Sequence, residues 1–195
     1  MIDFTADADI VAPQLLGAHL THGGVTVRLT EVEAYLGSQD EAAHTYRGPT
    51  ARNAAMFGPP GRMYVYLSYG IHLNGNIVCA PEGTGQGCLL RAGEVVDGLS
   101  TARARRGDVP DVRLAQGPGN LGSALGFALE DNGQPVTGPE FLLTERSFPP
   151  EIVHGPRVGI SKNTGAHLRF WIPDDPTVSR KKARKHGLPF PDGHG

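Results

Sequence analysis

The stretch VTVRLTEVEAY, residues 25–35, carries the clearest secondary-structure signal in the chain. In its first half, apolar residues alternate with polar ones, and this period of two predicts a β-strand with one buried face. The pattern reverses at Thr30, after which Glu31, Glu33 and Tyr35 occupy the positions that were apolar. The reversal indicates either a strand that runs out of the core into a cleft or a strand interrupted by a β-bulge.

The rest of the chain alternates short strands, loops and helices without a repeat. A helix is expected over residues 9–20, where Pro13 lies near the start, and two weaker helical stretches are expected within residues 95–130. No strand–helix–strand rhythm with a phosphate loop is present, which argues against a doubly wound nucleotide-binding fold. The sequence predicts a single α+β domain over residues 1–195 with a mainly antiparallel sheet. Further strands are expected at residues 63–69, 71–78, 88–94 and 168–172, and a turn at 68–70.

Length and composition limit the class of protein. The chain has 195 residues, and its 27 glycines and 16 prolines make it rich in loops but not of low complexity. No apolar run approaches the roughly 18 residues that a membrane-spanning helix needs. Residues 1–7 lack the basic and apolar regions of a secretory signal. We therefore expect a cytoplasmic protein whose two cysteines, Cys79 and Cys88, are reduced.

The net charge of −2 neither requires nor excludes a nucleic-acid partner. Basic residues gather toward the end of the chain, where residues 180–186 read RKKARKH. A basic, partly disordered tail over residues 180–195 is compatible with phosphate contacts, and a solvated terminus explains the same run equally well.

Several residues before position 60 are candidates for a site, although each has a simpler structural explanation. Glu33 and Tyr35 are two residues apart on one strand, so both point to the same side, as a general base beside a stacking platform would. A partly exposed strand end with an ordinary surface glutamate has the same spacing. His44 lies in a loop, where functional histidines are common, but a lone loop histidine is more often a surface or structural residue.

A second group of candidates follows in the next expected strands. Tyr64, Tyr66 and Tyr69 form a platform for a flat ring in one interpretation and half-buried sheet surface in the other. The Asn74-Gly-Asn76 group also has two interpretations. An asparagine amide there either hydrogen-bonds to the edge of a base or satisfies a buried backbone group. Arg91 lies in an apolar run and needs an anionic or carbonyl partner if it is buried.

Several kinds of chemistry are disfavoured by motifs that the sequence lacks. There is no histidine or cysteine motif with metal-ligand spacing, so we expect no metal and no other cofactor. There is no nucleophile elbow and no phosphate-binding loop. The first lysine of the chain is Lys162, far in sequence from the aromatic and acidic cluster, so Schiff-base chemistry in that cluster is not expected.

A series of longer motifs runs along the chain: EVEAYLG (31–37), DEAAH (40–44), PTARN (49–53), YVYLSYG (64–70) and LLR (89–91). In this order, and with further matches at 117–118, 157–160 and 168–170, they resemble the alkyladenine (3-methyladenine) DNA glycosylase family, whose members repair damaged purines. The resemblance covers residues 10–180. It implies a curved, mainly antiparallel sheet flanked by helices, similar to the formyltransferase C-terminal-domain-like fold.

The resemblance implies a hydrolase that flips damaged purines out of duplex DNA and cleaves their N-glycosidic bond. Its substrates would include 3-methyladenine, 7-methylguanine, hypoxanthine and ethenoadenine. Glu33 would be the general base that activates water, Arg91 would fix the water or a phosphate, and Tyr69 would fill the gap left by the flipped nucleotide. With no lysine expected in the site, the enzyme should leave an intact abasic site. A monomer is the default for a one-domain repair enzyme.

The resemblance also implies which residues bind the flipped base. Tyr35 and Tyr66 would stack on its opposite faces, an arrangement that favours a cationic alkylated ring. His44 would hydrogen-bond near the base or its sugar phosphate. Asn76 would exclude the exocyclic amine of guanine, and Val158 would lie near the site.

The chain departs from the family at residues 74–75, Asn-Gly, where apolar and bulky residues are common. This departure leaves the width of the pocket and the preferred damaged base open. Two other functions compete with glycosylase activity: a catalytically silent nucleic-acid-binding module and a hydrolase of free nucleosides. Glu33 argues against the first, because a pure binder gains nothing from a carboxylate near phosphates. A wedge at Tyr69 argues against the second, because only a duplex needs to be propped open.

Overall fold

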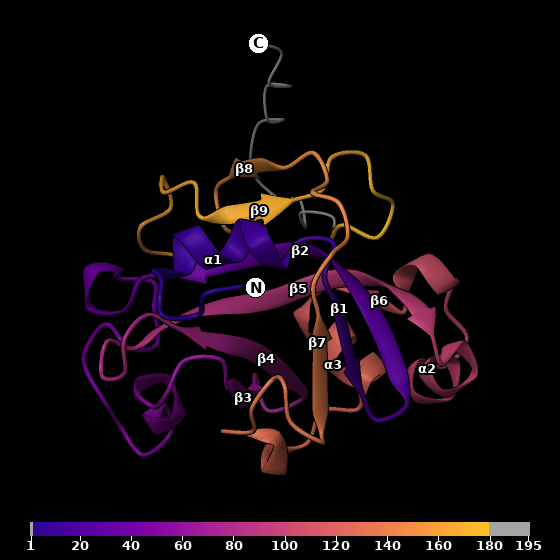
Figure 1. Cartoon of the computed structure of the whole chain (residues 1–195), viewed down its shortest axis with the longest axis horizontal. Helices are drawn as coiled ribbons and strands as arrows, with labels where there is room; N and C mark the ends of the chain where they lie inside the picture. Colours follow the sequence, from indigo (N-terminus) through magenta and orange to yellow (C-terminus); the bar gives the residue numbers. More distant parts are fainter. Residues whose placement is uncertain (1, 180–195) are drawn as a thin grey trace.

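The computed structural model describes residues 2–179, which form one α+β unit around a curved antiparallel sheet (Figure 1). Its strands are β1 (His19–His22), β2 (Val25–Tyr35), β3 (Met63–Ser68), β4 (His72–Cys79), β5 (Gln86–Asp97), β6 (Ala115–Gln116), β7 (Phe141–Thr144), β8 (Val153–Gly155) and β9 (Arg169–Trp171). They pair in the order β3-β4-β5-β2-β1-β7, while β6 pairs with β5, and β9 pairs with β2 and β8. The predicted basic tail, residues 180–195, lies outside the described residues.

The helices pack on the sheet. They are α1 (Ala8–Leu15), α2 (Leu99–Arg106) and α3 (Pro118–Leu125). α1 packs on β2, and α3 packs on β4 and β5 (Figure 1). At Gly122 the backbone of α3 approaches β4 so closely that a Cβ atom would overlap the carbonyl oxygen of Leu73, so glycine is required there. This contact fixes β4 against the body of the molecule.

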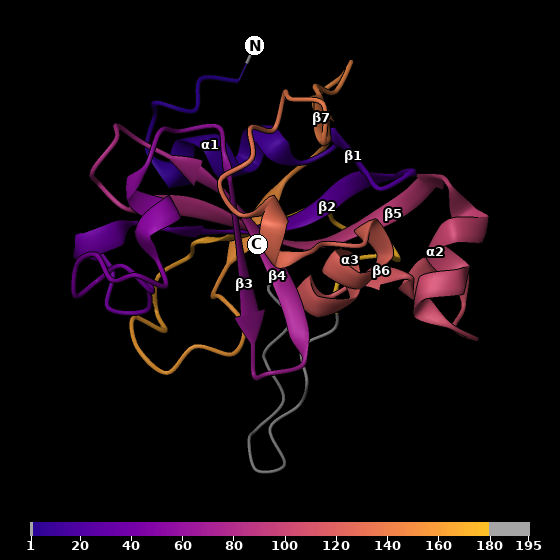
Figure 2. The same cartoon turned by 90° about the horizontal axis from the view of Figure 1, so that it is seen from below.

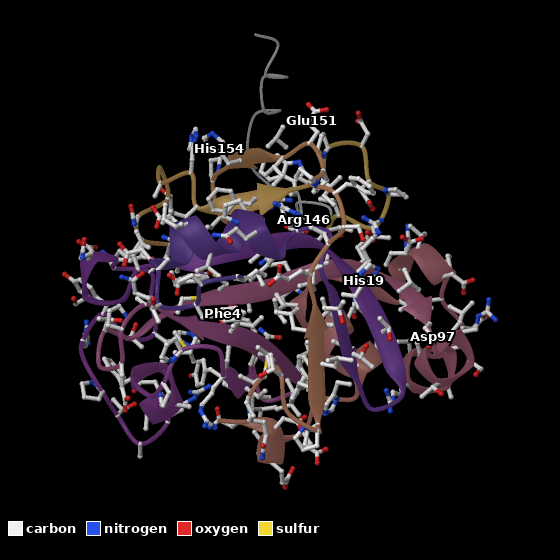
Figure 3. All side chains as sticks on the ribbon, viewed as in Figure 1. Phe4, His19, Asp97, Arg146, Glu151 and His154 are labelled. Carbon is white, nitrogen blue, oxygen red and sulfur yellow. The ribbon has the colours of Figure 1, made fainter. Side chains whose placement is uncertain are left out.

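The N-terminal helix is shorter than the sequence predicts. α1 ends at Leu15, and the chain turns at Gly17, whose φ of +83° is unfavourable for other residues. The residues that follow pair with β2 as β1 instead of continuing the helix. Pro13 lies in the second turn rather than near the start. Arg146 donates to the carbonyl oxygens of Pro13 (2.9 Å) and Leu16 (2.6 Å), and so satisfies acceptors that the helix end leaves free (Figure 3).

β2 is the central strand and has the bounds that its alternation predicts. Its register with β5 shifts between Leu29 and Glu31 and again between Glu31 and Val32. These irregularities coincide with the reversal of the pattern, as the β-bulge interpretation predicts. The strand is buried from Thr30 onward, up to the residue before Tyr35. The bulge therefore turns acidic side chains toward a buried interior and not toward an exposed strand end.

β3 and β4 form a hairpin that projects from the sheet on the side opposite α1 (Figure 2). The strands and the turn lie close to their predicted positions, and Tyr69 at the turn has a φ of +49°. On one face of the hairpin Met63 and Ile77 join the main hydrophobic core. The alternation of side chains leaves a polar, aromatic face on the other side, made of Tyr64, Tyr66, Asn74 and Asn76.

Four short strands, β1, β6, β7 and β8, have no counterpart in the sequence prediction. Each has two to four residues, too few for a periodic signal, and each is held by pairing with a longer strand or with another short one. In the described part of the chain, none of the helices has the length and hydropathy that crossing a membrane requires.

Candidate active site

A cavity of about 760 Å³ lies beside the β3–β4 hairpin. The polar face of the hairpin forms one wall, the loop between β2 and β3 forms another, and residues 158–162 between β8 and β9 form a third. Segments far apart in the sequence thus meet around one hollow, which is typical of a ligand site. The predicted site residues in its lining are Tyr35, His44, Tyr66, Tyr69, Asn76, Arg91 and Val158.

Of the predicted site residues, Glu33 alone lies outside the lining, fully buried behind the wall. Its Oε1 accepts a hydrogen bond from the backbone N–H of Val158 at 2.7 Å. Its Oε2 accepts from the Tyr35 hydroxyl at 3.0 Å and from Nη1 of Arg91 at 3.4 Å. These three partners all line the cavity. A carboxylate has about four acceptor positions, and residues 2–179 donate to three of those of Glu33.

Glu31 anchors the arginine that contacts Glu33. Its Oε1 accepts from Nε of Arg91 (3.0 Å) and from Nε of Arg169 (2.6 Å), and its Oε2 accepts from the backbone N–H of Ser179 (2.6 Å). The two carboxylates and two guanidinium groups are almost fully buried, so their opposite charges must balance inside the protein. The sequence predicts an anionic partner for Arg91 but gives no sign that Glu31 provides it.

The charged network sets the ionisation of its members. Burial alone raises the pKa of Glu31, but Arg91, Arg169 and the hydrogen bonds from Ser179 outweigh it and hold that pKa below its usual value. Burial, reinforced by the charge of Glu33, raises the pKa of the Tyr35 hydroxyl well above its usual range. Tyr35 is therefore a neutral donor to the carboxylate of Glu33.

Arg157 covers one face of the Tyr35 ring. Its guanidinium carbon lies 4.5 Å from the ring centroid. The same group donates to both oxygens of Asp40, which is also fully buried, with 2.8 Å between Nη2 and Oδ1. Asp40 and Arg157 belong to motifs quoted above, but sequence reasoning gave neither a role. The guanidinium of Arg157 is thus held between this carboxylate and the Tyr35 ring, which lines the cavity.

The hairpin and the β2–β3 loop bring a second aromatic group to the cavity. The rings of His44 and Tyr66 lie edge to face, with centroids 4.7 Å apart and planes at 80°. Tyr64 stacks on Tyr66 at 5.3 Å, so one face of Tyr66 is also covered by protein. Burial, and then the charge of Arg52, lower the pKa of His44, which leaves its imidazole neutral at neutral pH.

Tyr69 stands at the tip of the hairpin and is 92% exposed. Leu67 and Ile71, on either side of it, are 42% and 73% exposed. Figure 2 shows this hairpin reaching out from the molecule on the side away from α1. The hairpin tip therefore carries three large, exposed apolar or aromatic side chains.

A family model described as methylpurine-DNA glycosylase matches residues 2–176 of the chain. The chain belongs to the methylpurine-DNA glycosylase family. It is therefore an enzyme that acts on DNA, and the buried carboxylate, the aromatic cavity and the exposed hairpin tip belong to a glycosylase.

Bacterial relatives of this glycosylase cover most of its length. A protein of Corynebacterium glutamicum is 70% identical over 182 residues, which cover 93% of this chain and 96% of that protein. A relative from Cutibacterium acnes is 55% identical over 187 residues, which cover 92% and 98% of the two chains. A relative from Rhodopseudomonas palustris is 47% identical over 177 residues, covering 91% and 85%. All three are provisionally named 3-methyladenine DNA glycosylases.

Lys162 corrects the expectation that no lysine lies near the cluster. It lines the glycosylase cavity together with Val158, because β9 pairs with β2 and the β8–β9 loop returns over the end of that strand. Arg52 lines the same cavity and donates to the carbonyl oxygen of Leu67 at 2.8 Å. Lys162 lies outside the motifs quoted above, and Arg52 lies within the PTARN motif but was given no role there.

Two questions left open by the sequence are answered by the strand geometry. Asn76 donates through Nδ2 to the backbone carbonyl of Tyr64 at 3.3 Å, so it satisfies a buried backbone group while it lines the cavity. Gly75 faces the opposite side, where a Cβ atom would overlap the rings and methyl groups of Phe127 and Met63. The space that a larger side chain would occupy at position 75 is therefore filled by core residues. The glycine at this position does not widen the pocket.

Cys79 and Cys88 are buried free thiols, as expected, with their Sγ atoms 3.6 Å apart. Among residues 2–179, no group of three histidine, cysteine, aspartate or glutamate side chains is placed to hold a metal ion.

Proposed function

We propose that this glycosylase flips an alkylated or deaminated purine out of duplex DNA and hydrolyses its N-glycosidic bond with a water molecule activated by Glu33. Its substrates are 3-methyladenine, 7-methylguanine, hypoxanthine and ethenoadenine. One observation carries the proposal: the Glu33 carboxylate lies directly behind an aromatic cavity and is held by three groups of the cavity wall. A cavity of about 760 Å³ is also within the usual size range of small-ligand sites.

The exposed hairpin tip supplies the means of flipping. An N-glycosidic bond inside a duplex is out of reach, so the base must leave the stack at a cost of a few kcal/mol. Tyr69 enters the gap and replaces lost stacking, which is worth ~1–3 kcal/mol per base. Tyr66 lies three residues before Tyr69 on the same hairpin, so the wedge and the base-binding wall move as one element.

The flipped base lies between Tyr35 and Tyr66. Each ring already has one face covered, by Arg157 and by Tyr64 respectively, so both are held in place before the base arrives. Such preorganisation reduces the entropy lost on binding. The two electron-rich ring faces favour an electron-poor or cationic alkylated purine. The neutral imidazole of His44 is available as a hydrogen-bond donor or acceptor toward the base or its sugar phosphate.

Hydrolysis needs one carboxylate and one positioned water molecule. Glu33 accepts a proton from the water molecule while the water oxygen bonds to C1′ of the sugar. The base departs with the electron pair of the glycosidic bond. Arg91, Tyr35 and the backbone N–H of Val158 hold the carboxylate in a fixed orientation. The product is an intact abasic site. We place the enzyme in the cytosol, acting as a monomer on chromosomal DNA.

The test is release of free base from a methylated duplex and from a hypoxanthine-containing duplex by the wild-type protein. We expect release from both, with no reaction on the corresponding free nucleosides. Binding of damaged duplex without release would favour the silent binding module, and reaction on nucleosides alone would favour a nucleoside hydrolase.

A further inference from the structure

Lys162 is a basic side chain of the cavity that the proposed mechanism leaves without a role. It is exposed and lines the cavity from the β8–β9 loop. Two other bases of the lining are engaged: Arg91 by buried carboxylates, and Arg52 by the carbonyl oxygen of Leu67. Within residues 2–179, the ammonium of Lys162 has neither an ion pair nor a hydrogen bond. Its charge is therefore available to an anionic ligand of the cavity.

The segment that carries Lys162 is attached at both ends to buried acids. At one end, the backbone N–H of Val158 donates to Oε1 of Glu33 at 2.7 Å. At the other end, Nδ2 of Asn163 donates to Oδ1 of Asp40 at 2.9 Å. Asn163 has a φ of +47°, in the left-handed region that asparagine tolerates better than most residues. Lys162 therefore stands next to one of two attachment points, on a short segment that ties this wall of the cavity to the acids behind it.

The position of Glu33 indicates which part of a bound nucleotide lies near this segment. In the proposed reaction, a water molecule activated by Glu33 attacks C1′ of the sugar, so the sugar must stop beside the carboxylate that Val158 contacts. The phosphodiester groups on both sides are attached to the same sugar and therefore lie close to the cavity wall. A lysine ammonium is a compact charge on a long, flexible stem, and lysine is a common ligand of phosphate. A phosphodiester thus has both the charge and the position to meet Lys162.

We infer that Lys162 binds a phosphodiester group that flanks the flipped nucleotide. The contact holds the sugar at the mouth of the cavity and stabilises the flipped state of the DNA. This inference rests on the proposed function, because it assumes that a nucleotide enters the cavity. Glu41 is an exposed acid in the same lining, and within residues 2–179 no ion pair joins it to Lys162. Its carboxylate opposes an anionic ligand, so neutralising Glu41 should not weaken DNA binding as neutralising Lys162 does.

The experiment measures binding to a duplex that carries one tetrahydrofuran abasic analogue, which has the sugar ring and both phosphates but no base to release. Fluorescence anisotropy gives the affinity across a series of salt concentrations, for this duplex and for an undamaged one. On the analogue duplex, Lys162→Gln should lower the slope of log affinity against log salt by about one, the effect of one lost phosphate contact. Its affinity at low salt should fall roughly fivefold. On the undamaged duplex, which presents no flipped nucleotide, its slope should equal that of wild type.

Three further variants serve as controls. Lys162→Arg keeps the charge and should keep the wild-type slope, and Glu41→Gln should not lower the affinity. Arg113→Gln should also keep the slope. It removes an exposed charge on η3 (Asp111–Arg113), which follows α2 at the end of the sheet opposite the β2–β3 loop (Figure 1). All the substituted side chains are exposed, so thermal melting should show no change in stability.

Three results would overturn the inference. These are an unchanged slope for Lys162→Gln on the analogue duplex, an equal reduction on both duplexes, or an equal reduction in Arg113→Gln. The last two would mean that Lys162 adds to a general attraction for DNA and does not meet the flipped nucleotide. Release of hypoxanthine from duplex DNA by wild type tests the proposed function separately. Release with an unchanged slope would remove the inference but leave that function intact, and a slope that depends on Lys162 in a protein that releases no base would do the reverse.

Discussion

Glu31 and Glu33 point to the same side of one strand but have different surroundings. Glu31 binds Arg91, Arg169 and the backbone of Ser179, whereas Glu33 binds three residues that line the cavity, Tyr35, Arg91 and Val158. The alternation in β2 predicts that the two glutamates share a face. The spacing of Glu33 and Tyr35 predicts that these two side chains also lie on the same side. The sequence pattern of β2 does not separate the roles of the two carboxylates, because Arg169 and Ser179, which bind Glu31, lie far from β2 in the sequence.

Replacing Glu31 by glutamine should lower the free energy of unfolding by about 3–5 kcal/mol, because it leaves buried guanidinium charges uncompensated. Urea denaturation measures this change. Glu94 is a matched control: it lies on the adjacent strand β5 and forms a half-exposed ion pair with Arg28. Glu94→Gln should cost less than about 1 kcal/mol. An equally small loss for Glu31→Gln would show that the buried network does not stabilise the fold.

At the scale of elements, the sequence predicts those whose signal is local. β2 and the β3–β4 hairpin are long enough to show alternation, and residues 68–70 have the composition of a turn. β1 pairs with the longer strand β2, and β7 pairs in turn with β1, so neither has a periodic signal of its own. The helix α1 ends early, before the turn at Gly17. The β8–β9 loop has no periodicity, so only the family resemblance predicted Val158 near the site, and nothing in the sequence predicted Lys162 there.

The hairpin tip yields a prediction about duplex substrates. Tyr69→Ala should reduce base release from duplex DNA by roughly 10- to 100-fold, because the stacking that fills the gap is lost. The free energy of unfolding should stay unchanged, since the side chain is 92% exposed. A single-stranded hypoxanthine substrate is the control, because it has no gap to fill. Unchanged release from the duplex would exclude the wedge.

Because the β8–β9 loop brings Lys162 to the cavity, the expected absence of strand cleavage needs a direct test. Among residues 2–179, the ion pairs of Glu31 and Glu33 are formed by arginines and not by Lys162. We expect wild type to leave the abasic strand unbroken and borohydride to trap no covalent complex. Strand cleavage that disappears in Lys162→Ala would assign a Schiff base to that amine and contradict a monofunctional mechanism.

At the scale of the whole molecule, buried acids tie the C-terminal third of the described chain to the sheet and its loops. Burial raises the pKa of each carboxyl, but guanidinium partners and hydrogen bonds outweigh it, so each pKa lies below its usual value. The three pairs are Glu31–Arg169, Asp40–Arg157 and Asp175–Arg28. They connect residues more than a hundred positions apart, which explains why no local pattern revealed them.

These depressed pKa values predict acid sensitivity. Each pair contributes fully above the unfolded pKa of about 4 and loses its contribution as the pH falls through the lower folded pKa. The free energy of unfolding should therefore decrease most steeply below about pH 4. Urea denaturation across pH measures it, and Asp40→Asn should show a shallower acid slope than wild type. Stability that rises on acidification would contradict the charges assigned to these pairs.

The most direct test of the central claim is the single-turnover rate of hypoxanthine release from duplex DNA by wild type, Glu33→Gln and Glu94→Gln. General base catalysis contributes about 10²–10⁴-fold, so Glu33→Gln should release base at least 100-fold more slowly while it still binds the damaged duplex. Glu94→Gln should match wild type. A Glu33→Gln rate within a few-fold of wild type would show that this buried carboxylate is not the general base.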